Sequence, residues 1–233
     1  MPFPLGTAVN STFPPVAAAM FVRHPISGQV KTRLAHDIGA DNACSLYRAM
    51  VADVLTNINL FKMPIILFHD GVSGEELPEA WLAYAHKVFS QQGETLGERM
   101  AQAFELLFAN GAEKVILVGS DIPGIDVPLL QSTIDALDCS DAAFSPAYDG
   151  GYCLVALRKA GYSSSIFRDI PWSTEKVLLM TLDACRVAKL TYTLLDYRQD
   201  IDNADDLLAY SRNTLQSAPE TNTWLAEWNC MQT

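Results

Sequence analysis

One carboxylate stands where α/β proteins commonly carry out their chemistry. The apolar run Val115 to Val118 has the length of a strand and leads into a turn that contains Asp121. In open parallel sheets, ligands bind outside the carboxyl ends of the strands, where an Asp can reach a divalent cation on a phosphorylated substrate. Asp121 is therefore a candidate metal ligand and catalytic residue, with a capping role for the next helix as the alternative.

A second pair of carboxylates could complete such a cation site. Asp200 and Asp202 follow another expected strand, and period-two alternation places both on one face if the segment is extended. Asp202, or else Asp200, is the candidate second ligand beside Asp121. The alternative is that Asp202 or Asn203 caps the helix expected from residue 204.

A cluster of cationic side chains directly follows the first expected strand. Its members are Arg23, His24, Lys31 and Arg33. Gly28 frees the backbone to turn its N–H groups inward, Lys31 supplies a point charge, and Arg33 offers a bidentate fork. The loop predicts phosphate binding, against the alternative of a solvated run of charges, while His24 alone is weaker and suits a turn.

The segment that begins at Gln92 offers a second set of nucleotide contacts. Thr95 and Glu98 have the spacing of a capping box, so a plain helix start explains part of it. A helix N-terminus beside a flexible glycine also suits phosphate. The candidate nucleotide-binding residues in this segment are Gln92, Gly93 and Arg99.

Two later segments are candidates for substrate contact. Asp149 precedes two glycines, which permit a close approach between backbone and ligand, although a hairpin turn explains them almost as well. Trp172 is either a lid or a packing residue, and Ser173 or Thr174 is a plausible helix cap. The candidate substrate-binding residues are Gly150, Gly151, Tyr152, Trp172 and Ser173.

These segments require a sheet that brings them together. Strands are expected at 17–22, 64–68, 115–118, 142–145, 152–156 and 190–195, and helices at 42–60, 79–84, 96–110, 127–137, 174–188 and 204–215. Their alternation predicts an α/β fold with a doubly wound, mostly parallel sheet and one antiparallel excursion near Tyr152.

The length of 233 residues favours one principal domain. We expect it to span residues 17–212, between an N-terminal tail at 1–16 and a C-terminal tail at 213–233. Trp224 and Trp228 lie four residues apart, so a helix would place them on one face. That face could dock on the body of the protein or form a homodimer.

Composition excludes several classes of partner. A formal net charge of −11 repels nucleic-acid backbones and anionic membranes, so neither is expected. The apolar runs are too short to cross a bilayer, and no basic segment with a hydrophobic signal core opens the sequence. We therefore expect a cytoplasmic protein without membrane insertion.

Taken in order, these motifs are similar to those of the glycosyltransferase A-type (GT-A) nucleotide-diphospho-sugar transferase superfamily. More narrowly, the chain resembles the DUF2064 family. The resemblance spans roughly residues 17–210, in segments that begin at Pro25, Gln92, Gly119, Asp149, Pro171 and Asp200.

The resemblance implies a single-domain, Rossmann-like three-layer α/β/α sandwich with a mostly parallel mixed sheet. It implies that the first loop holds a nucleotide diphosphate and that Asp121 occupies the position of a metal-binding acidic residue, with Mg²⁺ or Mn²⁺ as cofactor. Gly119-Ser120-Asp121 replaces the Asp-x-Asp of many glycosyltransferases. Metal use therefore depends on Asp121 and a second ligand.

Three hypotheses follow. In the first, a glycosyl group passes from a nucleotide-sugar to a small-molecule acceptor, with Asp121, Asp149 and Lys31 as the catalytic residues. In the second, suggested by the likeness of residues 31–34 to phospholactate guanylyltransferases, an NTP is joined to a phosphorylated small molecule and diphosphate leaves. In the third, the protein binds a nucleotide without turnover.

Overall fold

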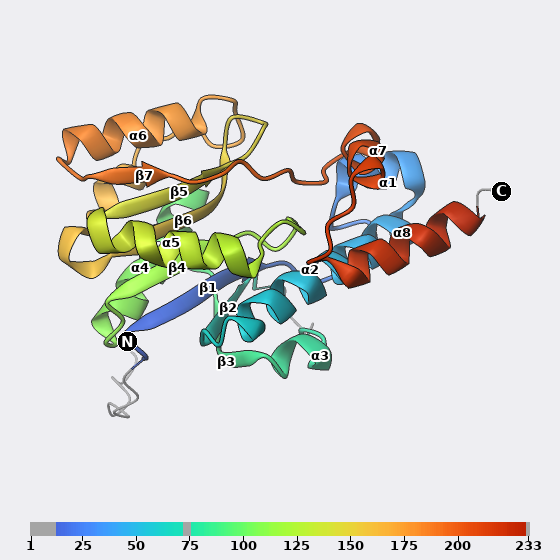
Figure 1. The fold of residues 1–233 in the computed structure, drawn as a ribbon, viewed down its shortest axis with the longest axis horizontal. Helices are drawn as coiled ribbons and strands as arrows, with labels where there is room; N and C mark the ends of the chain where they lie inside the picture. Colours follow the sequence, from blue (N-terminus) through green and yellow to red (C-terminus); the bar gives the residue numbers. More distant parts are fainter. Residues whose placement is uncertain (1–12, 72–75, 232–233) are drawn as a thin grey trace, which may run out of the picture.

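The computed structural model describes residues 13–71 and 76–231, which form a single α/β domain (Figure 1). A seven-stranded sheet has the order β3-β2-β1-β4-β6-β5-β7. Its strands are β1 Val16–Val22, β2 Ile65–His69, β3 Ala85–Ser90, β4 Lys114–Val118, β5 Ala142–Pro146, β6 Tyr152–Arg158 and β7 Tyr192–Leu194. Only β6 runs antiparallel to its neighbours, β4 and β5, which confirms the expected mixed sheet with its excursion at Tyr152.

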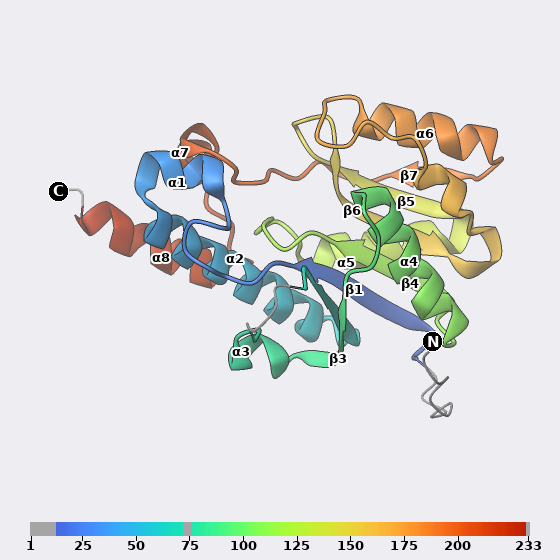
Figure 2. The same cartoon turned by 180° about the vertical axis from the view of Figure 1, so that it is seen from behind.

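Helices cover both faces of the sheet and give the expected three layers. They are α1 Thr32–Ile38, α2 Ala40–Leu60, α3 Glu79–Leu82, α4 Leu96–Ala109, α5 Val127–Cys139, α6 Val177–Val187, α7 Ala204–Arg212 and α8 Pro219–Met231, with short 3-10 turns at Lys159–Gly161 and Ser164–Phe167. Figures 1 and 2 show α5 and α4 on opposite faces.

The alternation of side chains along β1 separates two hydrophobic cores. Ala18 and Met20 point into the core beneath α2 and α5, whereas Ala17 and Ala19 point into the core beneath α4 and α6. Small residues in this central strand let helices pack closely on both sides. The chain can therefore bury a continuous apolar strand between two helical layers, as parallel sheets require.

Helix α1 and strand β3 are among the elements absent from the sequence prediction. Helix α1 begins within the segment expected as a loop and buries only Leu34, so it lacks a wide apolar stripe. Strand β3 lies at the edge of the sheet and alternates half-buried with exposed residues, without an apolar run.

Helix α6 begins at Val177 after Lys176, so the prediction that Ser173 or Thr174 caps it was wrong.

The ends of the chain pack against the body where they are described. Phe13 is buried, and its backbone N–H donates to the carbonyl of Asn110 at 2.7 Å. The expected N-terminal tail otherwise falls on residues outside those described. None of the helices in residues 13–71 and 76–231 is long and apolar enough to cross a membrane.

The segment expected as a C-terminal tail contains α8, which lies along α2 (Figure 1). Asp53 of α2 is fully buried and accepts hydrogen bonds from the backbone N–H groups of Glu220 and Thr221 at 2.9 and 2.8 Å. The Thr221 hydroxyl donates to it at 2.6 Å. Trp224 and Trp228 stack on each other with ring centroids 5.7 Å apart, so they do share one helical face.

Candidate active site

The candidate active site lies where the strand order reverses. From β1 the chain moves to β2 and β3 on one side, and then to β4 on the other side. The loops after β1 and β4 consequently separate, and a crevice opens between them at the carboxyl edge of the sheet. Residues 23–31 follow β1 and residues 119–126 follow β4, so the two segments selected from sequence face each other.

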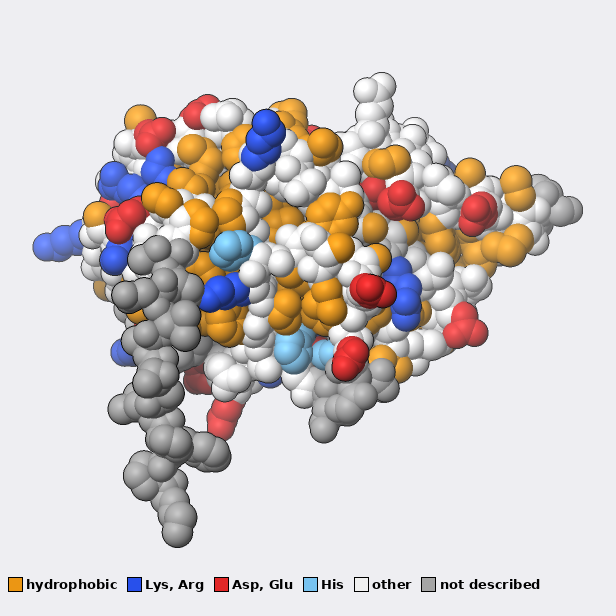
Figure 3. All heavy atoms as spheres, turned by 90° about the horizontal axis from the view of Figure 1, so that it is seen from below, with side chains coloured by type: hydrophobic (Ala, Val, Ile, Leu, Met, Phe, Trp, Pro, Cys, Tyr) orange, Lys and Arg blue, Asp and Glu red, His pale blue; other side chains and the backbone are white. Residues whose placement is uncertain are grey.

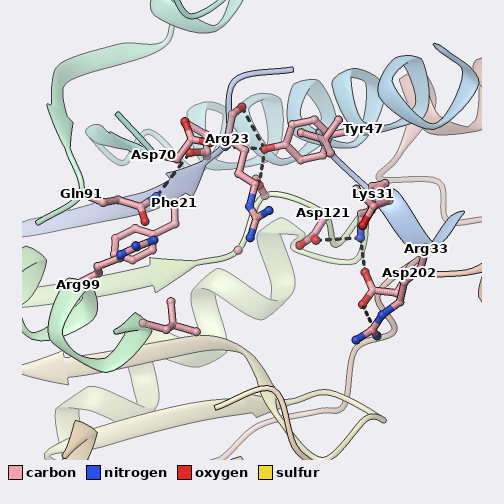
Figure 4. A pocket seen from close by; sticks show the side chains of 16 residues that line it. Phe21, Arg23, Lys31, Arg33, Tyr47, Asp70, Gln91, Arg99, Asp121 and Asp202 are labelled. Atoms are coloured by element: carbon pink, nitrogen blue, oxygen red, sulfur yellow. Dashed lines mark hydrogen bonds and ion pairs between the residues drawn. The ribbon is translucent and has the colours of Figure 1, made fainter. Parts of the chain in front are cut away.

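Lys31 is held between two carboxylates. Its Nζ lies 2.8 Å from Asp121 Oδ2 and 2.6 Å from Asp202 Oδ1, and its side chain is 5% exposed (Figure 4). Burial disfavours the ammonium, but attraction to both carboxylates outweighs it and raises the pKa of Lys31. Burial likewise opposes the charge on Asp121, yet Lys31 lowers the pKa of that carboxyl below its ordinary value.

The backbone at Lys31 is strained. Its φ of 47° and ψ of 46° lie in the left-handed region, and it precedes α1 without a side-chain cap. A residue with a Cβ rarely adopts this conformation, which costs about 1–3 kcal/mol and tends to occur at functional sites. Gly28 also has a positive φ, of 79°, with nothing within 4 Å of a Cβ placed on it, so it serves the turn rather than a tight contact.

Neither Asp121 nor Asp202 is needed as a helix cap. Asp126 caps α5 by accepting from the Leu129 N–H, and Asn203 caps α7 by accepting from the Asp206 N–H. The capping alternative for Asp121 is therefore wrong. For the second segment the expected cap is confirmed, but it is Asn203 and not Asp202. Asp202, rather than Asp200, is the carboxylate that meets Asp121 across the Lys31 ammonium.

A cavity of about 650 Å³ opens beside this cluster, and four cationic side chains line it. They are Arg23, Lys31, Arg33 and Arg99, against three carboxylates, Asp70, Asp121 and Asp202. Figure 4 shows two ends: Lys31, Arg33, Asp121 and Asp202 lie at one, and Phe21, Gln91 and Arg99 at the other. The cavity is thus locally basic in a protein whose net charge is −11.

Tyr47 connects the two loops under the cavity. Its hydroxyl accepts from the Arg23 N–H at 2.9 Å and lies 2.9 Å from Ser120 Oγ, a pair in which either atom donates. Burial raises the pKa of Tyr47 to about 12, so the hydroxyl stays protonated. The contact fixes the loop after β1 to the loop after β4.

The segment after β3 contributes to the cavity in a register shifted from the prediction. Gln91 lines it and donates to the Phe68 carbonyl at 3.0 Å, whereas Gln92 is exposed and lines neither this cavity nor the second one. Arg99 lines it and donates from Nε to the Gly93 carbonyl at 3.0 Å. The predicted capping box of Thr95 and Glu98 is confirmed at the start of α4.

A second cavity, of about 290 Å³, adjoins the first and shares Phe21, Leu96, Gly119 and Asp121 with it. Its lining combines apolar side chains with two further carboxylates, and it contains no Lys, Arg or His. The predicted residues that line it are Asp149, Gly151, Tyr152, Trp172, Ser173 and Asp200. Burial, followed by repulsion from Asp202 and Asp149, raises the pKa of Asp200 to about 6.

Glycines hold the wall of the second cavity in place. Gly150 has a φ of 89°, and a Cβ there would lie 2.2 Å from the Glu175 carbonyl oxygen. At Gly97, a Cβ would lie 2.3 Å from the Phe167 carbonyl oxygen and 2.9 Å from Trp172 Cζ2. The Asp149 turn and the start of α4 therefore approach their neighbours at backbone distance. Gly150 supports the wall without lining it.

A protein family and several solved structures are similar to this chain. The model of a family described as an uncharacterized protein conserved in bacteria (DUF2064) matches residues 55–174. The chain is 31% identical to a candidate nucleotide-diphospho-sugar transferase from Desulfovibrio desulfuricans G20, covering 93% of this chain and 99% of that one, with a TM-score of 0.82. No curated protein matches.

More distant structures share the fold alone. The inositol-1-phosphate CTP transferase from T. maritima is 11% identical over 91% of this chain and 97% of that one, with a TM-score of 0.56. The 4-diphosphocytidyl-2C-methyl-D-erythritol synthase from Anaerococcus prevotii is 14% identical over 85% and 98%, with a TM-score of 0.55.

Proposed function

We propose a function from one premise: this chain belongs to the DUF2064 family and is a transferase with the nucleotide-diphospho-sugar transferase fold. It transfers a glycosyl group from a nucleotide-diphospho-sugar to a hydroxyl of a small-molecule acceptor. The observation that carries the proposal is the contrast between two joined cavities. The first is lined by four cations, the second by none, and both are lined by Asp121.

The first cavity suits a nucleoside diphosphate. Lys31 and Arg33 supply charge at one end, where the diphosphate would lie, and Arg23 projects between the ends (Figure 4). Phe21 and Gln91 at the other end offer an aromatic face and an amide for the base. As the glycosyl bond breaks, negative charge grows on the diphosphate, and preorganised cations stabilise that charge more than they stabilise the bound substrate.

Asp121 and Asp202 suit a divalent cation by their chemistry. Carboxylate oxygens are the ligands preferred by Mg²⁺ and Mn²⁺, and these two carboxylates already share one positively charged group, the Lys31 ammonium. Asp121 and Asp202 would hold the cation, which when bound neutralises the nucleoside-diphosphate leaving group. Lys31 would then donate to phosphate oxygens in place of the carboxylates.

The second cavity suits an uncharged, hydroxyl-rich ligand. Asp149 and Asp200 accept hydrogen bonds from hydroxyls, and Trp172 presents an apolar ring for the face of a sugar. The competing nucleotidyl transfer would bring a phosphorylated co-substrate to this cavity, where three carboxylates and no cation would repel it. The lining therefore favours glycosyl transfer.

The test is thermal stabilisation by a panel of nucleotide-sugars and nucleoside triphosphates, with and without Mn²⁺. A nucleotide-sugar at one hundred times its dissociation constant should add about 2.7 kcal/mol of stability. Asp121→Asn should lose the manganese-dependent part. Asp205→Asn, which makes the same charge change at an exposed position three residues from Asp202, should keep it.

Product analysis then identifies the reaction. Release of a nucleoside diphosphate from the stabilising nucleotide-sugar, dependent on an acceptor, supports glycosyl transfer. Release of inorganic diphosphate from a triphosphate overturns it in favour of nucleotidyl transfer, for which the four cations of the first cavity are also sufficient. Tight binding with no product from either class would indicate a non-catalytic nucleotide-binding protein.

A further inference from the structure

A second group of metal-ligating side chains lies one strand away from Asp121. His24 follows β1, His69 ends β2, and Asp70 follows directly. Strands β1 and β2 are parallel, with Val22 paired to His69, so both strands deliver their next residues to the same edge of the sheet. The three side chains meet for this topological reason, although 45 residues separate His24 from His69 in sequence.

The donor atoms of these residues are close together. One ligand atom from each of His24, His69 and Asp70 lies within 4.8 Å of the other two, and no other such trio of His, Cys, Asp or Glu occurs in residues 13–71 and 76–231. His24 Nδ1 lies 2.5 Å from Asp70 Oδ1, and the two imidazole rings are 5.2 Å apart, edge to face. Modest side-chain shifts would bring all three donors to one ion.

We propose that His24, His69 and Asp70 bind a zinc-type transition-metal ion at a site separate from the Asp121–Asp202 pair. Imidazole nitrogens suit Zn²⁺ and its neighbours, whereas Mg²⁺ prefers oxygen donors. Two imidazoles and one carboxylate are three of the four ligands of a tetrahedral zinc site, and the fourth position is left open to solvent or ligand. The chain thus carries two cation sites of different chemical type.

The surroundings are arranged to orient the ligands. His24 is 3% exposed, and its own backbone N–H also donates to Asp70 at 3.2 Å. His69 accepts from the Gly71 N–H at 3.1 Å, and its Nε2 lies 3.3 Å from Ser90 Oγ. A metal-binding histidine donates its other ring N–H, so His69 would bind the ion through Nδ1, in place of the Gly71 N–H, while its Nε2–H donates to Ser90 Oγ.

The site is reachable and adjoins the first cavity. His69 is half-buried, and the side chain of Asp70 is 23% exposed. Figure 3, which views the molecule from the side of β3, shows histidine side chains at the surface. Asp70 also lines the first cavity. A bound ion would therefore lie beside the region that we assign to the nucleotide, with its open position available to a donor atom of a ligand.

The test uses the full-length protein without an affinity tag, titrated with Zn²⁺ by calorimetry and with Co²⁺ by absorption spectroscopy. We expect one zinc equivalent that binds at least tenfold more weakly to His69→Ala, and visible bands of four-coordinate cobalt that the variant loses. His36→Ala is the matched control, because His36 is exposed, lines neither cavity and contacts Asp37, with its Nδ1 3.2 Å from Asp37 Oδ1. It should bind like wild type.

Equal zinc affinity in wild type and His69→Ala, or a cobalt spectrum that is octahedral in both, would overturn the proposal. If His69→Ala does not fold, as judged by circular dichroism, His69→Gln retains the bulk and gives the same comparison. The outcome is independent of the proposed glycosyl transfer, because nucleotide-sugar stabilisation with Mn²⁺ is measured separately through Asp121.

Discussion

Charged side chains at the two edges of the sheet differ in their surroundings: those at the carboxyl edge line a cavity, and those at the amino edge connect strands. At the carboxyl edge, Lys31 lies in a strained backbone between Asp121 and Asp202, and all three line a cavity. At the amino edge, Asp141 accepts from Arg158 Nη2 at 2.6 Å and from the Thr191 hydroxyl at 2.7 Å, away from both cavities. The adjoining cavity thus distinguishes the proposed ligand site from a cluster that only joins strands. Backbone strain alone does not, because Lys62 and Lys189, which precede β2 and β7 at the amino edge, are left-handed as well.

Lys31→Met should have the largest effect, which is a loss of reaction rate. Removal of one preorganised charge from a developing anion costs about 10²–10³ in rate, which is about 2.7–4 kcal/mol. We expect kcat/KM for the nucleotide-sugar to fall by that factor. The melting temperature should fall as well, because Asp121 and Asp202 lose the ammonium that they share. Lys62→Met is the control, since Lys62 is also left-handed, with a φ of 58°, but is exposed. If Lys31→Met melted early and kept its nucleotide affinity, the carboxyl-edge cluster would be structural, like the amino edge.

Gly150→Ala should have the next largest effect. The added Cβ would lie 2.2 Å from the Glu175 carbonyl oxygen in a left-handed backbone, so we expect a loss of about 3 kcal/mol in the free energy of unfolding. Nucleoside diphosphate binding in the first cavity should survive, while transfer to the acceptor falls. Chemical denaturation and separate binding and turnover assays measure this.

Gly28→Ala is the matched control for that substitution. Gly28 is also left-handed but has open space around it, so it should lose only about 1 kcal/mol. A similar loss in both variants would mean that the close approach at Gly150 does not shape the second cavity.

Apart from the glycine control, the smallest expected effect is at the amino edge, on Asp141→Asn. Hydrogen bonds from Thr191 and Arg158 lower the pKa of Asp141, so its stabilisation is fully present above its unfolded pKa of about 3.8 and is lost as pH falls through the lower folded value. Asp141→Asn should be less stable by about 1–2 kcal/mol at pH 7, and the difference should shrink below pH 4. Denaturation curves at several pH values measure this. Weakened nucleotide binding in Asp141→Asn would contradict the assignment of separate roles to the edges.

Much of this arrangement was predictable from sequence. Apolar runs such as Val115 to Val118 identified strands, and their alternation with helices identified the edge at which the site forms. Every carboxylate predicted to do chemistry lines one of the two cavities. The separation of Asp202 from Asp200 was not predictable, because period-two alternation places both on one face while the structure assigns them to different cavities.

Other features could not be predicted from the sequence, for physical reasons. The glutamine that lines the first cavity was predicted one residue too late, as Gln92 instead of Gln91. The reason is that the edge strand β3 has no apolar run to define where the following loop begins. His24 was interpreted as a turn residue because its partners, His69 and Asp70, are distant in sequence and only the pairing of β1 with β2 unites them. Such pairings depend on topology, which local patterns do not encode.

The attachment of α8 to α2 bears on the order in which the molecule matures during synthesis. Asp53 is made early, yet its hydrogen-bond partners, Glu220 and Thr221, emerge from the ribosome more than 160 residues later. Until α8 has been made, the Asp53 carboxylate is solvated by water. The face of α2 that α8 covers in the folded protein is exposed to solvent. Strands β1 to β4 can begin to pair on the nascent chain, but the core beneath α2 is complete only when α8 has been made.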